Sequence, residues 1–194
     1  MAHCLISGNG KPATALPFQI FDPVGIFGDI SSIKFVALSC AMFTRAEASL
    51  IKQEFWTTFG KYMSPVPSSE GIKINWVNYH TKTKDVYFRM HTGPKHATIS
   101  IAIEHADPDI REMYFEQFLE LRDLLHASLQ EEWSWQLHAV SDDGKVTTRI
   151  FKELPNTSVL NKNDWPALIS FFKTRIIALD EFWENARYSF DALH

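Results

Sequence analysis

Two alternating apolar runs, separated by a turn sequence, constrain the fold of this chain more than any other feature. In residues 86–90 and again in residues 99–104, a large apolar side chain occupies every second position. Successive side chains of a β-strand point to opposite faces, so each run predicts a strand with one buried face. The intervening Thr-Gly-Pro-Lys, residues 92–95, predicts a hairpin turn in which Phe88 lies opposite Ile99.

Further strands are predicted on both sides of this hairpin. Residues 72–77 and 133–140 alternate in the same way, each with tryptophan among its apolar positions. Asp143 and Gly144 then form the kind of dipeptide that favours a tight turn, and they lead into residues 145–151. The sequence therefore predicts five strands.

Helices are predicted where apolar residues recur at steps of three and four positions. The first begins after Thr44, which has the spacing of a capping box with Glu47. A second begins after Asp107 and runs to about residue 130, and a third begins at Asp164. The order helix, three strands, helix, two strands, helix predicts an α/β (α+β) domain with a mixed five-stranded sheet. Its middle helix allows a parallel, right-handed crossover.

The domain is expected to occupy residues 42–194, because residues 1–41 have a different composition. They contain both cysteines, four of the eight glycines and only four charged residues. We expect a poorly ordered N-terminal extension there. Two origins stay open: a genuine tail, or sequence upstream of a natural start at Met42, which stands two residues before the helix cap.

Overall composition sets limits on partners and compartment. The net charge is −4 and the pI is near 6.0, so bulk charge gives no reason to expect nucleic acid or an anionic membrane. Two cysteines do not indicate a disulfide framework or a cysteine metal site, and this usage suits a reducing cytosol. With no secretory signal and no apolar stretch long enough to span a membrane, the expected location is the cytoplasm.

Several segments together resemble a known bacterial family, domain of unknown function 4268. The resemblance covers about residues 42–190 and is carried by IKQEFWTTFGKYM, GIKINWVNYHTKTKDVYFRM, IAIEHADPDIREMYFEQF, EEWSWQ and DWPALISFFKTRIIALDEFW. Members of that family also occur with nuclease-like and restriction-type domains, so the resemblance implies a link to nucleic-acid processing. It supplies no catalytic residues.

The order of elements is also similar to the core of restriction-endonuclease-like proteins. This likeness implies that two carboxylates should lie close together if the chain holds a metal ion as those proteins do. Such nucleases hold a divalent cation with an Asp on the second strand and the Glu of a Glu-x-Lys on the third. The predicted register places Asp85 opposite Ala102, one diagonal step from Glu104. The lysine is missing, because Ala106 follows Glu104 at that spacing, and Arg89 cannot act as a base at neutral pH.

Two interpretations of Glu104 therefore stay open. It is either a metal ligand with Asp85, holding Mg²⁺ or Mn²⁺, or a strand-end carboxylate paired with a nearby cation such as Arg89, Arg111 or Lys84. His91 and His96 are expected to share a sheet face, but two histidines fall short of a zinc site.

Charge distribution gives the one indication of a partner. Residues 72–96 carry a local balance of +4, from Asp85 and the five bases Lys73, Lys82, Lys84, Arg89 and Lys95, whereas residues 107–132 carry −6. A basic segment of this kind can follow a phosphate backbone or meet an acidic protein surface. The tryptophans could stack on bases, although their alternation favours core packing.

The sequence thus predicts a non-catalytic or degenerate nuclease-like module, without a cofactor, that acts as a protein or nucleic-acid adaptor. The alternative is a metal-dependent DNA endonuclease that uses Asp85 and Glu104.

Overall fold

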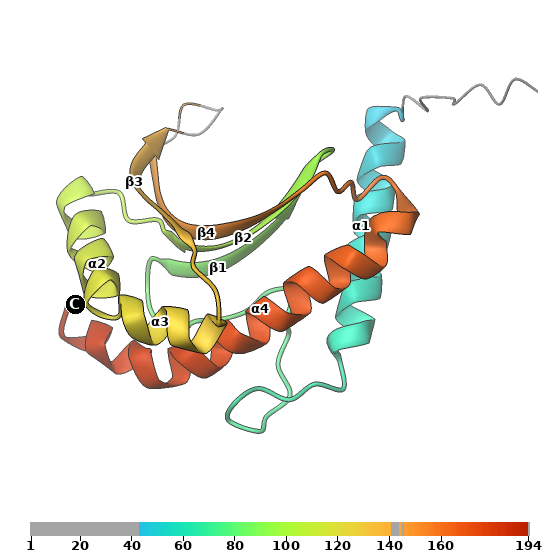
Figure 1. Ribbon diagram of the computed structural model, residues 1–194. Coiled ribbons are helices and arrows are strands. Elements are labelled where there is room, and N and C mark those ends of the chain that lie inside the picture. Colours follow the sequence, from blue (N-terminus) through green and yellow to red (C-terminus); the bar gives the residue numbers. More distant parts are fainter. Residues whose placement is uncertain (1–42, 141–143, 145, 194) are drawn as a thin grey trace, which may run out of the picture. The chain divides into compact units, whose positions relative to one another are not determined.

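Four antiparallel strands and four α-helices make up the computed structural model, which describes residues 43–140, 144 and 146–193 (Figure 1). The sheet order is β1-β2-β4-β3, with β1 at Val86–Thr92, β2 at His96–Ile103, β3 at Ser134–Val140 and β4 at Val146–Pro155. The α-helices are α1 at Arg45–Met63, α2 at Pro108–Glu120, α3 at Arg122–Leu129 and α4 at Trp165–Ala186. Short 3-10 helices occupy Lys162–Asp164 and Arg187–Leu193. The α/β class and the order of these elements confirm most of the expectation.

The predicted mixed, five-stranded sheet is wrong in strand number and in pairing. Every neighbouring pair of strands is antiparallel. Because β2 and β3 both pair with β4, they run parallel to each other, as the crossover required, but β4 lies between them. A three-strand meander ahead of the crossover, the basis of the likeness to restriction endonucleases, is absent from the described residues.

Residues 72–77 form a loop in which Ile74 and Trp76 pack in or against the core, whereas Ile72 is 50% exposed. The side chain of Asn75 accepts hydrogen bonds from the backbone amides of Val77 and Asn78, at 3.1 and 3.3 Å. Such a turn competes with the extended backbone of a strand. Trp76 is nonetheless buried, and its indole donates a 2.9 Å hydrogen bond to the carbonyl of Val66. Burial of Ile74 and Trp76 thus accounts for part of the alternating pattern without a strand.

The β1–β2 hairpin is tighter than the four-residue turn that the sequence predicted. Gly93 donates a backbone hydrogen bond of 2.8 Å to His96, which leaves Pro94 and Lys95 as the turn. Only a residue without a side chain fits easily there, since a Cβ on Gly93 would lie 3.2 Å from the His96 carbonyl oxygen. Phe88 consequently pairs with Ile101 rather than Ile99. A shift of two residues keeps every side chain on its predicted face.

The helix starts were predicted correctly because capping is a local property. Thr44 and Glu47 form the reciprocal capping box at α1, and these hydrogen bonds from Thr44 lower the pKa of Glu47. The Asp107 side chain accepts from the amide of Asp109 at 2.9 Å. The single helix expected over residues 107–130 is two helices, because the backbone breaks at Leu121.

The core lies between the sheet and the apolar stripe of α4, and it confirms the predicted buried residues. Phe88, Ile101, Phe172 and Trp183 are buried, and the rings of Phe88 and Trp183 are 5.8 Å apart. Three of the tryptophans expected in the core, Trp133, Trp135 and Trp165, are buried or partly buried against it. Tyr62, predicted on the packed face of α1, is 51% exposed.

Some expectations fall outside the described residues. These are the N-terminal extension at 1–41, the proposed start at Met42 and the contribution of Asp143 to the β3–β4 turn. In the described part of the chain, no helix has both the length and the apolar character needed to cross a membrane.

Candidate nucleic-acid interface

Glu104 pairs with Arg89, one of the two interpretations that the sequence left open. The carboxylate accepts two hydrogen bonds from one guanidinium, at 3.1 Å from Nε and 3.0 Å from Nη2. These hydrogen bonds raise the pKa of Arg89. A parallel, two-point contact of this kind fixes the direction of both side chains.

Asp85 lies directly before β1, yet its side chain does not join that of Glu104. The tighter hairpin brings the two backbones together, with the Glu104 amide donating 2.8 Å to the Asp85 carbonyl. Asp85 has φ of +62°, so it leaves the alternation of the strand. Its carboxylate lies 3.9 Å from His105 Nε2 and 3.9 Å from Lys84 Nζ.

The two carboxylates line different surface hollows. Asp85 lines one with His105 and Tyr114, and Glu104 lines another with Arg111 and His105. Within the described ranges, no group of three or more His, Cys, Asp or Glu side chains is placed to hold a metal ion. The Mg²⁺ or Mn²⁺ site at Asp85 and Glu104 therefore stays a prediction that this geometry does not favour.

Three of the five predicted nucleic-acid-binding residues come together beside β1. One open hollow of about 530 Å³ is lined by Lys82, Lys84 and Arg89. Tyr87, which lies on β1 like Arg89, lines it as well. Residues 77–84 form the other wall. Lys73, in the loop, and Lys95, in the hairpin turn, are exposed but do not line this hollow.

Nearby carboxylates reduce the positive charge of this surface. Lys82 pairs with Glu70 at 3.0 Å, and Arg89 pairs with Glu104 at 3.0 Å. Each of the three bases of the hollow thus has a carboxylate within 4 Å. Over residues 72–96 together with Glu70 and Glu104, five bases stand against three carboxylates, so the balance falls from +4 to +2. Lys84 keeps most of its freedom, since its side chain is 76% exposed and its contact with Asp85 is long.

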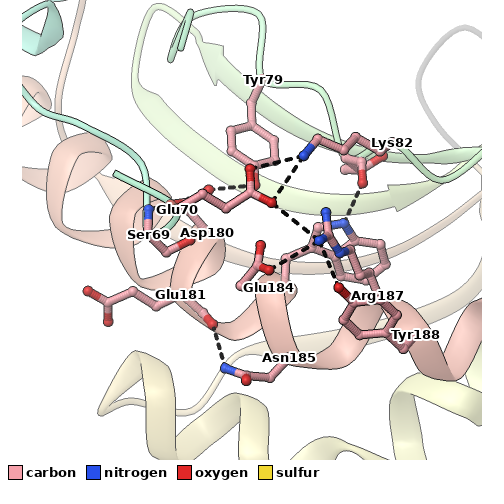
Figure 2. A network of polar contacts seen from close by, with 12 residues as sticks. Ser69, Glu70, Tyr79, Lys82, Asp180, Glu181, Glu184, Asn185, Arg187 and Tyr188 are labelled. Carbon is pink, nitrogen blue, oxygen red and sulfur yellow. Dashed lines mark hydrogen bonds and ion pairs between the residues drawn. The ribbon is translucent and has the colours of Figure 1, made fainter. Parts of the chain in front are cut away.

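A network of polar contacts connects residues 69–82, the loop that carries Lys82, to the end of α4 (Figure 2). Glu70 holds Lys82 at 3.0 Å and also accepts from Arg187 Nη2 at 3.2 Å. Arg187 Nη2 in turn lies 3.1 Å from Glu184 Oε1, one turn earlier in the chain. Lys82 itself has φ of +64°, a conformation that needs such support from its surroundings.

Asp180 is the buried centre of the same region. It is 4% exposed, and it accepts hydrogen bonds from the Tyr79 hydroxyl at 2.7 Å and the Ser69 amide at 2.6 Å (Figure 2). Burial, and then the hydrogen bond to Asp180, raise the pKa of the Tyr79 phenol. Removal of either partner would leave a buried polar group unsatisfied. These contacts fix residues 69–82 against α4.

Sequence reasoning missed this network, although one signal was present. Asp180 interrupts the apolar stripe of the last helix, one turn from Ile176 and from Trp183. A carboxylate on a buried face requires hydrogen-bond donors. The position of Asp180 in the sequence therefore indicated that a donor lies nearby, but not which residue supplies it. Tyr79 could not be identified because it lies in a loop 101 residues away.

A small pocket of about 240 Å³ adjoins this network. Its walls include Ile74, Tyr79, Trp183 and the buried Ser68. The hydroxyl of Ser68 has no hydrogen-bond partner among the described residues. Lys82 lines both this pocket and the hollow beside β1, so the two are neighbours.

Comparisons with known proteins give one match. A family model described as Domain of unknown function (DUF4268) matches residues 51–187, which is more than half of the chain. Searches of curated proteins and of solved structures gave no match.

Proposed function

The chain belongs to the family described as Domain of unknown function (DUF4268), and we propose that it is a non-catalytic module that binds nucleic acid beside β1. One observation carries the proposal: Lys82, Lys84 and Arg89 line a single hollow next to an aromatic side chain, Tyr87. Phosphate oxygens accept hydrogen bonds from Lys and Arg, and a hollow with several such donors can follow a phosphate backbone.

The distribution of acids supports one direction of approach. Exposed carboxylates gather on α2 and α3, at Asp109, Glu112, Glu116, Glu120 and Asp123. A polyanion is repelled from those helices and attracted to the loop and strand that carry the bases. We also propose a cytoplasmic location, since a chain with only two cysteines suits a reducing compartment.

Salt-dependent binding tests the proposal. Fluorescence anisotropy would follow a labelled oligonucleotide between 50 and 200 mM salt, conditions that separate phosphate contacts from other contacts. We expect affinity to fall with salt, and Lys84→Gln to weaken binding and lower the logarithmic slope by roughly 0.7 to 1. Lys61→Gln is the matched control, since Lys61 is an exposed lysine in the last turn of α1.

Two results would contradict the proposal. One is the absence of binding to any oligonucleotide at low salt. The other is DNA cleavage in Mn²⁺ that both Asp85→Ala and Glu104→Ala abolish, which would make the protein a metal-dependent nuclease.

A further inference from the structure

The face of the sheet that points away from the core suggests which form of nucleic acid this module takes. Among the described residues, α3 and α4 lie on one side of the sheet and no helix lies over the other (Figure 1). The open face is formed by alternate residues, including Tyr87 and Arg89 of β1 and Arg149 and Phe151 of β4. α1 approaches this face near the hairpin, where burial, Lys52 of α1 and His96 lower the pKa of His91.

Two arginine–aromatic pairs stand on this open face. The Arg89 guanidinium lies 4.3 Å from the centre of the Tyr87 ring, and that of Arg149 lies 4.4 Å from the centre of the Phe151 ring. In each pair the two residues are separated by one position on the same strand, so they point the same way. In each pair the guanidinium lies over the ring, so the pair presents a stacked, positively charged platform on the open face.

Small side chains form the floor between the two platforms. Tyr87 and Arg149 are both cross-strand partners of Ala102, and Arg89 and Phe151 are both partners of Ser100. Neighbouring strands lie about 4.8 Å apart, so β1 and β4 are separated by about 10 Å. Small side chains of β2 therefore separate the two arginine–aromatic platforms.

Both guanidiniums are held in place before any ligand arrives. Glu104 fixes Arg89 through two hydrogen bonds, and the Gln136 side chain accepts from Arg149 Nε at 2.9 Å. The terminal nitrogens of Arg149 have no hydrogen-bond partner in the described part of the chain. A platform ordered in advance loses less entropy on binding.

On the premise of the proposed function, we propose that this open face binds single-stranded nucleic acid through base stacking on the Tyr87–Arg89 and Phe151–Arg149 platforms. Bases of a single strand are free to stack on aromatic rings and on guanidinium planes, whereas duplex bases already stack on each other. Arg149, whose terminal nitrogens have no partner in the described part of the chain, and Lys84, which is 76% exposed, supply the positive charge that a polyanion would meet. Arg89 and Lys82 are offset by Glu104 and Glu70.

The test compares one labelled oligonucleotide as a single strand and as a duplex. We expect the wild-type chain to prefer the single strand. Tyr87→Ala or Phe151→Ala should weaken single-strand binding about 5- to 100-fold, the effect of losing one stacked base. Tyr87→Phe, which keeps the ring, should bind like the wild type.

Tyr62→Ala is the matched control. Tyr62 is also partnered by a cation, since Lys173 Nζ lies 4.9 Å from its ring centre, but it stands on α1. Its substitution should leave binding unchanged. Melting temperatures of all variants show whether each is folded.

The outcomes separate this inference from the proposed function. Equal affinity for single strand and duplex, with Lys84→Gln weakened but folded Tyr87→Ala unchanged, would overturn the stacking inference and keep nucleic-acid binding. A wild-type chain that binds neither form overturns both. Binding of polyglutamate in place of nucleic acid would overturn both in favour of an acidic protein partner.

Discussion

The two faces of one sheet differ in what their side chains do. On the covered face, Phe88, Ile101 and Ile150 are buried against α4 and its neighbours. On the other face, alternate residues of the same strands carry arginine–aromatic pairs over a floor of Ser100 and Ala102. The covered face therefore accounts for stability, and the open face leaves charged and aromatic groups available for a partner. Substitutions on the two faces should differ accordingly.

The largest effects on stability should come from the covered face. Ile101→Ala and Phe172→Ala each leave a cavity in a fully buried site, and each should lower the free energy of unfolding by about 2 to 5 kcal/mol. Thr98→Ala, on the opposite face of β2, should cost well below about 1 kcal/mol. Urea titration measures all three, and a core variant as stable as Thr98→Ala would contradict the assignment of faces.

An intermediate effect is expected where the loop is tied to α4. Tyr79→Phe removes the hydroxyl that donates to buried Asp180, and it should cost roughly 1 to 3 kcal/mol. Tyr62→Phe changes an exposed tyrosine and serves as the control. A Tyr79→Phe protein as stable as the wild type would show that this hydrogen bond does not hold the loop.

The same contact predicts a dependence on alkaline pH. The pKa of Tyr79 is higher in the folded chain than in the unfolded chain. The stabilisation that the protonated Tyr79 gives to the folded chain is therefore complete below about pH 10 and is lost as pH rises further. The free energy of unfolding should therefore fall less steeply above pH 10 in Tyr79→Phe than in the wild type. Urea titrations at several pH values measure this dependence. If the free energy of unfolding fell equally steeply with pH in both proteins, the raised pKa would not belong to Tyr79.

The smallest effect should come from Glu104. Its pair with Arg89 is partly exposed, with 52% of the arginine side chain accessible, so Glu104→Gln should change stability by about 1 kcal/mol or less. Neither Mg²⁺ nor Mn²⁺ should raise the melting temperature of the wild type. A cation-dependent rise that Glu104→Gln removes would instead identify a metal site.

What the sequence could predict was local. The caps at Thr44 and Asp107 depend on residues within three positions, and both were found. The faces of β1 and β2 followed from alternation, but their register depended on how closely Gly93 approaches His96. Because the predicted register was wrong by two residues, an even number, each side chain was still assigned to the correct face of the sheet.

The remaining errors involved contacts between distant segments. Residues 72–77 alternate because Trp76 packs into the core, and its bond to Val66 is made in a loop. The candidate site shows the same limit. The basic residues were predicted from composition, but their neutralisation by Glu70 and Glu104 required the fold. Arg149 and Phe151 became candidates only when pairing placed β4 beside β2.

The most direct test of the account is the location of bound nucleic acid. An amide nitrogen–proton NMR titration with a single-stranded oligonucleotide should shift signals from residues 82–92, 98–104 and 147–153, which form the β1 edge and the open face. Signals from residues 116–123, which include Glu116, Glu120 and Asp123, should stay in place, because these acids repel the ligand. Shifts confined to α2 and α3, or saturable binding that leaves β1 and β4 unperturbed, would contradict it.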